Sequence, residues 1–328
     1  MYGIIPSIYG KFSKLINMEL DGNAISGSIP SELFSMSQLS YIDISYNSIT
    51  GSIPTEIGQS SDLMGFIVSG NMIQGTIPSE IANMDALNYL RLCDNKLTGT
   101  LPTDLGRMTI LKDLIIGTNL FSGIIPTEFG SLSDGESIEL SFNQLVGTIP
   151  SQFKNLLNLR LLDLTENALT GSIPIELTLL TQLCDTLALS MNNLTGSLPS
   201  ELGRLRRVSN LRLNDNAFTG AIPTQVGYMT NLEGLIDLSR NKLSGTLPSE
   251  LGNLINMSGL YLFDNTAIRG TVPTELGQLS NLVEFLAYGT HLNGSVPLEL
   301  CKLFDTNNMT KLVMECDIFC SCCTDFCY

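Results

Sequence analysis

The chain of 328 residues is 43% hydrophobic and only 15% charged. This composition supports a large buried core and excludes a disordered chain. A formal net charge of −15 excludes nucleic acid and anionic lipid as main partners, because both are bound through Lys and Arg that neutralise phosphates.

A single phrase repeats from the start of the chain to residue 300. All 13 prolines end it, and a glycine lies three positions before each of them, giving G-x-[I/L/V]-P in one register. The steps between prolines are 24 residues, with three of 25. The prolines are Pro6, Pro30, Pro54, Pro78, Pro102, Pro126, Pro150, Pro174, Pro199, Pro223, Pro248, Pro273 and Pro297. A fixed period of this length predicts a solenoid whose neighbouring coils share one core.

Each coil begins with the pattern L-x-x-L-x-L, as at residues 159–164. The pair L-x-L places two leucines on one face of a short strand, so these predict a parallel sheet with the intervening residues facing solvent. The glycine permits a turn with positive φ. The proline fixes φ and removes a backbone N–H that would otherwise need a hydrogen-bond partner in an irregular segment. The Ser or Thr after the proline, followed by an acid, predicts a cap and first turn of a short helical segment.

An asparagine recurs four positions before the glycine. Its buried amide is expected to satisfy backbone groups at the bend and to repeat these bonds from coil to coil as a ladder. Two late coils have Thr266 and Thr290 at this place, the former beside Asn265, so the ladder is expected to loosen there. The ladder residues are Asn23, Asn47, Asn71, Asn95, Asn119, Asn143, Asn167, Asn192, Asn216 and Asn241.

Six of the eight cysteines cluster at the C-terminal end: Cys301, Cys316, Cys320, Cys322, Cys323 and Cys327. They predict a disulfide cap over the exposed end of the core, with Cys322 and Cys323 each pairing elsewhere. Fifteen pairings are open, and C-x-C and C-x3-C spacings leave a metal site as the alternative. Cys93 and Cys184 lie too many coils apart to pair, so both are expected to be free thiols.

The whole unit, L-x-x-L-x-L-x-x-N-x-L-T-G-x-I-P-x-E-L-G-x-L, is identified as a leucine-rich repeat, and L-[T/S]-G-x-[I/L]-P, as at residues 97–102, is typical of the plant type. The chain resembles the extracellular domains of plant receptor-like kinases and the secreted polygalacturonase inhibitors. This implies an α/β repeat solenoid of about 12 repeats, with a parallel sheet on the concave face, a short second sheet and short helical or 3-10 segments.

The resemblance predicts two regions, a solenoid at residues 1–300 and a cysteine-rich cap at 301–328. The tail, with Cys322, Cys323 and Thr324, resembles the cap of diatom-type leucine-rich-repeat proteins. At the other end the repeat is already running at Gly3, and neither the family's N-terminal cysteine cap nor a signal peptide precedes it. The chain is therefore expected to be a truncated form of a protein that is extracellular or on the cell surface. No apolar run is long enough to insert this chain into a membrane.

Catalysis is not expected. The single histidine, His291, lies in what reads as a variable, solvated turn, and no phosphate-binding glycine loop is present. Repeated acids follow from the repeat and need no glycosidase explanation. We expect no enzyme activity, no cofactor and no metal. Four sequons, at Asn193, Asn256, Asn293 and Asn308, are candidate glycosylation sites.

Two groups of outward side chains on the predicted strands are candidate ligand-binding surfaces. Both combine aromatic residues, which supply contact area at low entropic cost, with charged ones; scattered exposed apolar residues without function are the alternative. The C-terminal group is Asp237, Arg240, Tyr261, Phe263, Asp264, Glu284, Leu286 and Tyr288, with its three aromatic side chains expected side by side. The N-terminal group is Tyr41, Asp43, Tyr46, Tyr89, Arg91 and Asp94.

The leading hypothesis is an extracellular recognition scaffold for a protein, peptide or polysaccharide. A structural or adhesive wall protein is the alternative from another class, and a single saturable partner would distinguish the first from the second. Rows of hydroxyls beside the glycines, such as Thr98 and Thr100, permit a third hypothesis, ice binding. Since function lies in sites placed on folds, the resemblance does not name the ligand.

Overall fold

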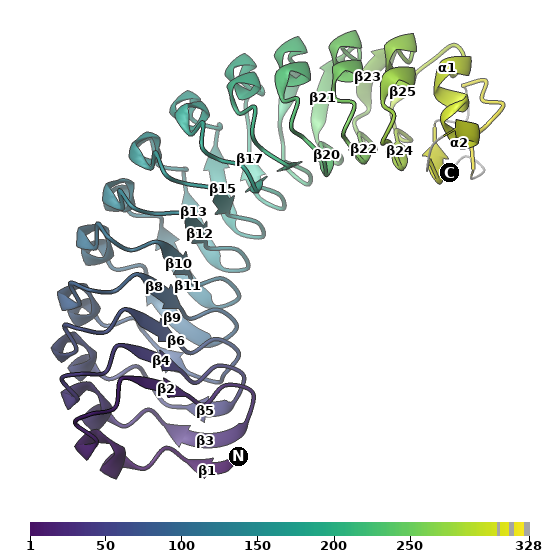
Figure 1. The fold of residues 1–328 in the computed structure, drawn as a ribbon. Coiled ribbons are helices and arrows are strands. Elements are labelled where there is room, and N and C mark those ends of the chain that lie inside the picture. The colour runs from purple at the N-terminus through teal and green to yellow at the C-terminus, as the bar shows by residue number, and fades with distance from the viewer. Residues whose placement is uncertain (307–308, 315–317, 325–328) are drawn as a thin grey trace. The chain divides into compact units, whose positions relative to one another are not determined.

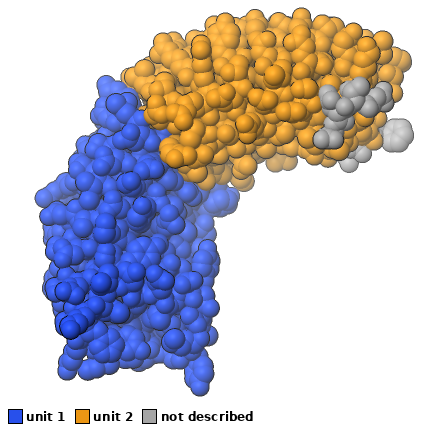
Figure 2. All heavy atoms as spheres, viewed as in Figure 1, with its two compact units in different colours: residues 1–159, 166–168 blue, residues 160–165, 169–328 orange. Residues whose placement is uncertain are grey.

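The computed structural model describes residues 1–306, 309–314 and 318–324. Each coil contains a short strand of a first sheet, a second short strand and a short helical turn, in that order along the chain (Figure 1). The second strands pair into three separate parallel sheets, which together we call the second sheet. The coils fall into two compact units (Figure 2). Unit 1 contains Met1–Leu159 and Glu166–Ala168, and unit 2 contains Arg160–Thr165 and Leu169–Tyr328.

The first sheet is parallel in both units, and its middle residues are buried. Leu114, for example, lies opposite Leu90 on one side and Ile138 on the other. In unit 1 its strands are β2 (Asn17–Glu19), β4 (Tyr41–Asp43), β6 (Gly65–Ile67), β8 (Tyr89–Arg91), β10 (Asp113–Ile115) and β12 (Ser137–Glu139). In unit 2 they are β14 (Leu161–Asp163), β16 (Thr186–Ala188), β18 (Asn210–Arg212), β20 (Leu235–Asp237), β22 (Gly259–Tyr261), β24 (Glu284–Leu286) and β26 (Lys311–Val313).

The second sheet follows the L-[T/S]-G part of each repeat, and the glycine there has positive φ, as at Gly99 with 85°. Hydroxyls before this glycine donate to the glycine carbonyl of the preceding coil, at 3.2 Å from Thr50 to Gly27 and 3.3 Å from Thr98 to Gly75. The strands up to residue 147 are β1 (Tyr2–Ile4), β3 (Ala24–Ser28), β5 (Ser48–Thr50), β7 (Gln74–Gly75), β9 (Lys96–Thr100), β11 (Leu120–Ile124) and β13 (Gln144–Gly147). From residue 168 they are β15 (Ala168–Gly171), β17 (Asn193–Leu194), β19 (Thr219–Ala221), β21 (Lys242–Gly245), β23 (Ala267–Gly270) and β25 (His291–Leu292).

Each proline begins a helical turn, but the expected capping by Ser or Thr is wrong. The proline itself takes the cap position in extended conformation, and no side chain caps these turns, as at η5 after Pro102. Where the next hydroxyl bonds at all, it donates to a neighbouring carboxylate, as Ser200 does to Glu201 at 3.0 Å. The turns are η1 (Ser7–Lys11), η2 (Ser31–Ser35), η3 (Thr55–Gln59), η4 (Ser79–Asn83), η5 (Thr103–Arg107), η6 (Thr127–Ser131), η7 (Ser151–Asn155), η8 (Ile175–Leu179), η9 (Ser200–Arg204), η10 (Thr224–Tyr228), η11 (Ser249–Asn253) and η12 (Thr274–Gln278).

The asparagines connect each coil to the one before it. The Nδ2 group of buried Asn119 donates to the carbonyls of Ile116 and Gly117 in its own coil and of Leu92 in the preceding coil, at 3.0–3.2 Å. Its Oδ1 accepts the N–H of Leu97 at 2.9 Å. The amide therefore has both donors and its acceptor engaged, as a buried amide requires.

The expected loosening at Thr266 is wrong, because Asn265 takes the ladder position. Its Nδ2 donates to the carbonyls of Leu238 and Leu262, at 2.9 Å each, and its Oδ1 accepts the N–H of Leu243 at 3.0 Å. The extra residue lies between the asparagine and the glycine, so counting back from Gly270 misplaced the ladder. At Thr290 the hydroxyl donates to the Ala287 carbonyl at 2.7 Å and replaces only part of the asparagine pattern.

The C-terminal end is closed by α1 (Leu298–Cys301), α2 (Leu303–Thr306) and β26. β26 pairs with β24, and its outer edge exchanges hydrogen bonds with Thr324. Leu300 of α1 and Leu303 of α2 are buried. Disulfides join Cys301 to Cys322 and Cys320 to Cys323; Cys316 and Cys327 lie outside the described residues.

The helical elements are all short. Within the described ranges, no helix has the length and apolar character needed to cross a bilayer.

Candidate functional site

In each coil from β2 to β24, one residue lies beside the end of the first sheet. It lies three positions after the first-sheet strand and directly before the ladder residue. Its φ is positive, between 51° and 57° where it is not glycine. L-residues rarely adopt this conformation. The neighbouring coil holds it, as when the Arg240 N–H donates to the Phe263 carbonyl at 2.8 Å. We name these positions the turn row: Tyr46, Asp94, Thr118, Phe142, Glu166, Met191, Asp215, Arg240 and Asp264, with glycine at 22, 70 and 289.

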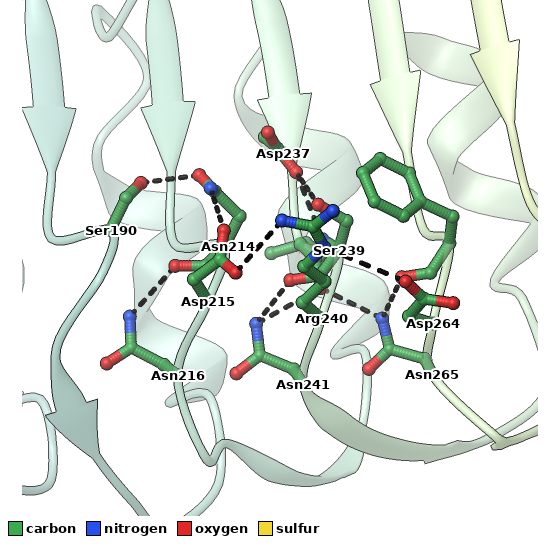
Figure 3. Close-up of polar contacts among 12 residues, drawn as sticks. Ser190, Asn214, Asp215, Asn216, Asp237, Ser239, Arg240, Asn241, Asp264 and Asn265 are labelled. Carbon is green, nitrogen blue, oxygen red and sulfur yellow. Dashed lines mark hydrogen bonds and ion pairs between the residues drawn. The ribbon is translucent and has the colours of Figure 1, made fainter. Parts of the chain in front are cut away.

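Four predicted ligand residues belong to this row, not to the strands, contrary to the sequence-based assignment: Tyr46, Asp94, Arg240 and Asp264. In unit 2, Arg240 lies between two acids of the same row (Figure 3). Its guanidinium is 3.4 Å from Asp215 Oδ1 and 3.7 Å from Asp264 Oδ2, and the Arg240 side chain is 58% exposed. Such exposed pairs add little to stability, so their main effect is to orient the arginine.

The same arginine lies beside an aromatic pair. Its Cζ is 5.5 Å from the centre of the Phe263 ring. Phe263 in turn stacks on Tyr288, with ring centres 4.8 Å apart and planes 10° from parallel. Both rings are partly exposed. The cation–π contact and the stack fix two rings side by side at the surface.

Tyr261 is not directed into this stack. Its hydroxyl donates to the Glu284 carboxylate on the next strand, β24. Burial raises the pKa of Tyr261 well above its ordinary value, and the hydrogen bond to Glu284 raises it further. Tyr261 therefore stays protonated and holds Glu284 on the sheet. Of the three aromatic side chains expected together, the structure brings two into contact.

Asp237 has a local structural role. Its Oδ1 accepts the backbone N–H of Ser239 at 3.0 Å and the Ser239 hydroxyl at 2.6 Å. Asp43 in unit 1 makes the same two bonds with Ser45. Burial raises the pKa of Asp237, although the bonds from Ser239 oppose this. These two predicted ligand residues thus close the bend after their strands.

Three polar residues that the sequence analysis did not select extend this region. Ser190 donates to Asn214 Oδ1 at 2.5 Å, and Asn214 Nδ2 donates to Asp215 Oδ2 at 2.8 Å (Figure 3). Asn214 and Asp215 begin the motif N-D-N at residues 214–216, and only their place in the repeat could have indicated them. We name the following residues the unit 2 face: Ser190, Asn214, Asp215, Asp237, Arg240, Tyr261, Phe263, Asp264, Glu284 and Tyr288.

The predicted N-terminal group has a different geometry. The Tyr41 ring lies over Gly65 of the next strand, so close that a Cβ there would be 2.4 Å from two ring carbons. The Tyr46 ring covers Gly70 in the same way, at 2.6 Å. Burial raises the pKa of Tyr41, and the charge of Asp43 adds to this. Tyr41 thus fills the space that Gly65 leaves, whereas Tyr46 lies over Gly70 and remains 66% exposed.

Arg91 completes the unit 1 group. Its guanidinium is paired with Asp113, which the sequence analysis did not select, and its Cζ is 5.8 Å from the Tyr89 ring centre. Asp94 is exposed in the turn row. We name Tyr41, Asp43, Tyr46, Tyr89, Arg91 and Asp94 the unit 1 face.

His291 was expected in a turn but lies in strand β25, paired with Arg269 of β23. It is exposed, and its Nδ1 contacts the Thr266 carbonyl. Cys93 and Cys184 are free thiols. Across the described parts of the chain, no three His, Cys, Asp or Glu residues are grouped as a metal site. Asn193 and Asn293 are exposed and Asn256 is partly exposed, while Asn308 lies outside the described residues.

Comparisons with known proteins agree with this repeat architecture. The Leucine Rich Repeat family model matches residues 38–60, 86–108, 136–156, 158–180, 185–205 and 235–254. A TDR receptor structure is 29% identical with a TM-score of 0.90, over 97% of this chain and 54% of the receptor chain. The chain is a plant-type leucine-rich-repeat protein. A comparison with curated protein sequences gave no match.

Two further structures similar to this leucine-rich-repeat protein contain peptide ligands. The plant peptide hormone receptor RGFR1, in complex with RGF2, is 29% identical with a TM-score of 0.80, over 96% of this chain and 58% of that one. The Arabidopsis receptor kinase HAESA ectodomain, in complex with an IDA peptide hormone, is 26% identical with a TM-score of 0.66, over 98% and 60%. The leucine-rich-repeat protein thus spans 54% to 60% of the length of these three receptor chains.

Proposed function

We propose that this leucine-rich-repeat protein is a non-catalytic extracellular scaffold that binds a protein or peptide at the unit 2 face. In this proposal residues 1–300 form the binding array, and residues 301–328 close its end. The observation that carries the proposal is the Phe263–Tyr288 stack, held at the surface beside Arg240. Fixed aromatic side chains with polar neighbours are typical of the centre of a binding site.

The charges around the stack indicate the chemistry of the partner. Arg240 faces two carboxylates, Asp215 and Asp264, and a further carboxylate, Glu284, is held on β24 by Tyr261. Because acids outnumber the one arginine, the surface favours a peptide segment with a basic residue next to an apolar one. The peptide-bound receptor ectodomains support a peptide partner by similarity.

An interaction screen of the purified 328-residue chain against secreted proteins and peptides tests this proposal. We expect a saturable partner whose Kd rises about thirtyfold in Tyr288→Ala, because a buried aromatic hot spot contributes about 2 kcal/mol. Phe263→Ala should act similarly. Tyr41→Ala is the matched control, since its ring packs within unit 1.

Two outcomes would contradict the proposal. Wild-type affinity in both Tyr288→Ala and Phe263→Ala would remove the unit 2 face as the site, and loss of binding in Tyr41→Ala would move it to the unit 1 face. If no saturable partner is found and the chain only crosslinks wall material, the structural or adhesive function replaces recognition.

A further inference from the structure

The outer surface of unit 2 has a second feature, on the 3-10 turns and away from the first sheet. An open hollow of ≈ 430 Å³ lies between η9 and η10. Hollows of this size accommodate small ligands. It is lined by Ser200, Glu201, Gly203, Arg204, Arg206, Gln225 and Tyr228.

The hollow is the basic part of an acidic protein. Three arginines occur within four residues, at Arg204, Arg206 and Arg207, in a chain with a formal charge of −15. The buried residues Leu202, Leu205 and Val208 anchor this segment, so all three arginines are exposed. Arg207 is engaged by the Gln182 side chain.

The neighbouring turn lacks the acid that the repeat usually supplies. The second residue of most turns is Glu or Asp, but η10 has Gln225 there. Two arginines in the hollow thus face one carboxylate, Glu201. Through the described parts of the chain, Arg204 and Arg206 have no carboxylate within ion-pair distance.

In the described part of the chain, the equivalent arginine of unit 1, Arg107, has the ion pair that Arg204 and Arg206 do not have. Arg107 occupies in η5 the place of Arg204 in η9, and its guanidinium lies 3.6 Å from Asp104. Guanidinium groups bind phosphate and sulfate oxygens through paired hydrogen bonds, and they are weakly hydrated. Arg204, the last residue of η9, and Arg206, two residues beyond it, have no carboxylate at ion-pair distance among the described residues and are therefore better suited to an oxyanion than Arg107 is.

Tyr228 adds an apolar surface at the same place. It follows Gln225 on η10 and its side chain is 48% exposed. An aromatic ring at the edge of a cationic hollow favours an anion carried on a ring, because the ring can stack while the oxyanion meets the arginines. From this combination we propose that the hollow binds a phosphate or sulfate monoester through Arg204 and Arg206, with Tyr228 contacting the group that carries it.

Calorimetric titration of the full chain with phenyl phosphate, phenyl sulfate, inorganic phosphate and inorganic sulfate tests this site. We expect saturable binding of both esters, tighter than that of the inorganic ions. Replacing both arginines (Arg204→Gln with Arg206→Gln) should weaken ester binding by about tenfold or more. Tyr228→Ala should remove the preference for the esters and leave inorganic binding unchanged.

Two matched variants make the test specific. Gln225→Glu restores the acid that most other turns carry, so it should fold normally and weaken binding by repelling the anion. Arg107→Gln, on the paired arginine of unit 1, should leave binding unchanged. Absence of saturation at millimolar ester, or equal weakening by Arg107→Gln, would overturn the proposal. Because the hollow lies off the first sheet, partner binding at the unit 2 face should be unaffected by these variants.

Discussion

The two faces of the first sheet both carry aromatic residues, but at different places in the repeat and with different contacts. In unit 1 the neighbouring coils offer glycine at 65 and 70, and the tyrosine rings fold down over them. In unit 2 the coil next to Phe263 offers Tyr288, and the two rings stack on each other at the surface. The residue opposite on the next coil therefore decides whether an aromatic ring lies over a glycine or stacks on a second ring. Exposure alone does not separate the two faces, because Tyr46 is 66% exposed.

Unit 2 also differs from unit 1 in having a disulfide-linked end. Reduction should destabilise the coils around β24 and β26 by about 3 kcal/mol, because the Cys301–Cys322 link closes a loop with a sequence separation of 21. Hydrogen exchange with and without reductant should show faster exchange there and unchanged exchange in unit 1. Equal loss of protection in unit 1 and unit 2 would contradict this prediction, because reduction would then destabilise both units together.

The two faces share the asparagine ladder, so damage to it should cost the same in each unit. Asn119→Ala in unit 1 and Asn241→Ala in unit 2 each remove a buried amide with four hydrogen bonds. We expect each to lower the free energy of unfolding by about 2–3 kcal/mol, since buried partners are left unsatisfied. Urea unfolding monitored by circular dichroism measures this. If only one of the two variants lowers the free energy of unfolding, the asparagine ladder does not stabilise the two units equally.

The glycine contacts give the most direct test of the comparison. Gly65→Ala places a methyl group inside the Tyr41 ring volume and should cost about 1–2 kcal/mol. In the Tyr41→Ala background, Gly65→Ala should lower the free energy of unfolding much less, and a double-mutant cycle measures this difference. The control is Gly259→Ala in unit 2, where the nearest atom is Leu235 Cβ at 3.2 Å. If Gly65→Ala and Gly259→Ala lower the free energy of unfolding equally, the packing role assigned to Tyr41 is refuted.

The smallest expected effect concerns Asp237. Because its pKa is raised on folding, the folded state binds this proton more tightly than the unfolded state. The resulting stabilisation is present below the unfolded pKa and is lost as pH rises through the folded pKa. Asp237→Asn keeps an acceptor for Ser239 and removes the buried charge, so it should be as stable as wild type or slightly more stable at neutral pH. A variant that is less stable at neutral pH than in acid, relative to wild type, would contradict this.

The sequence predicted the repeat because the prolines, glycines and leucines each have one physical role per coil. It could not place side chains at the bends equally well. Counting from the strand put Arg240 and Asp264 on the sheet, whereas the left-handed turn moves them to its end. Counting back from Gly270 similarly missed Asn265. The direction of Tyr261 depended on Glu284, a contact between coils that no spacing within one repeat specifies.

The turn row has an evolutionary consequence. Its backbone is fixed by the neighbouring coil, while its side chain is exposed at every non-glycine position except Asp215, which is partly exposed. Tyr, Asp, Thr, Phe, Glu, Met and Arg all occupy it with nearly the same φ. Each coil thus has one position whose side chain can be substituted without a change of fold, and duplication of a coil duplicates that position. A solenoid of this kind can change what it recognises one position at a time while its stability stays nearly constant.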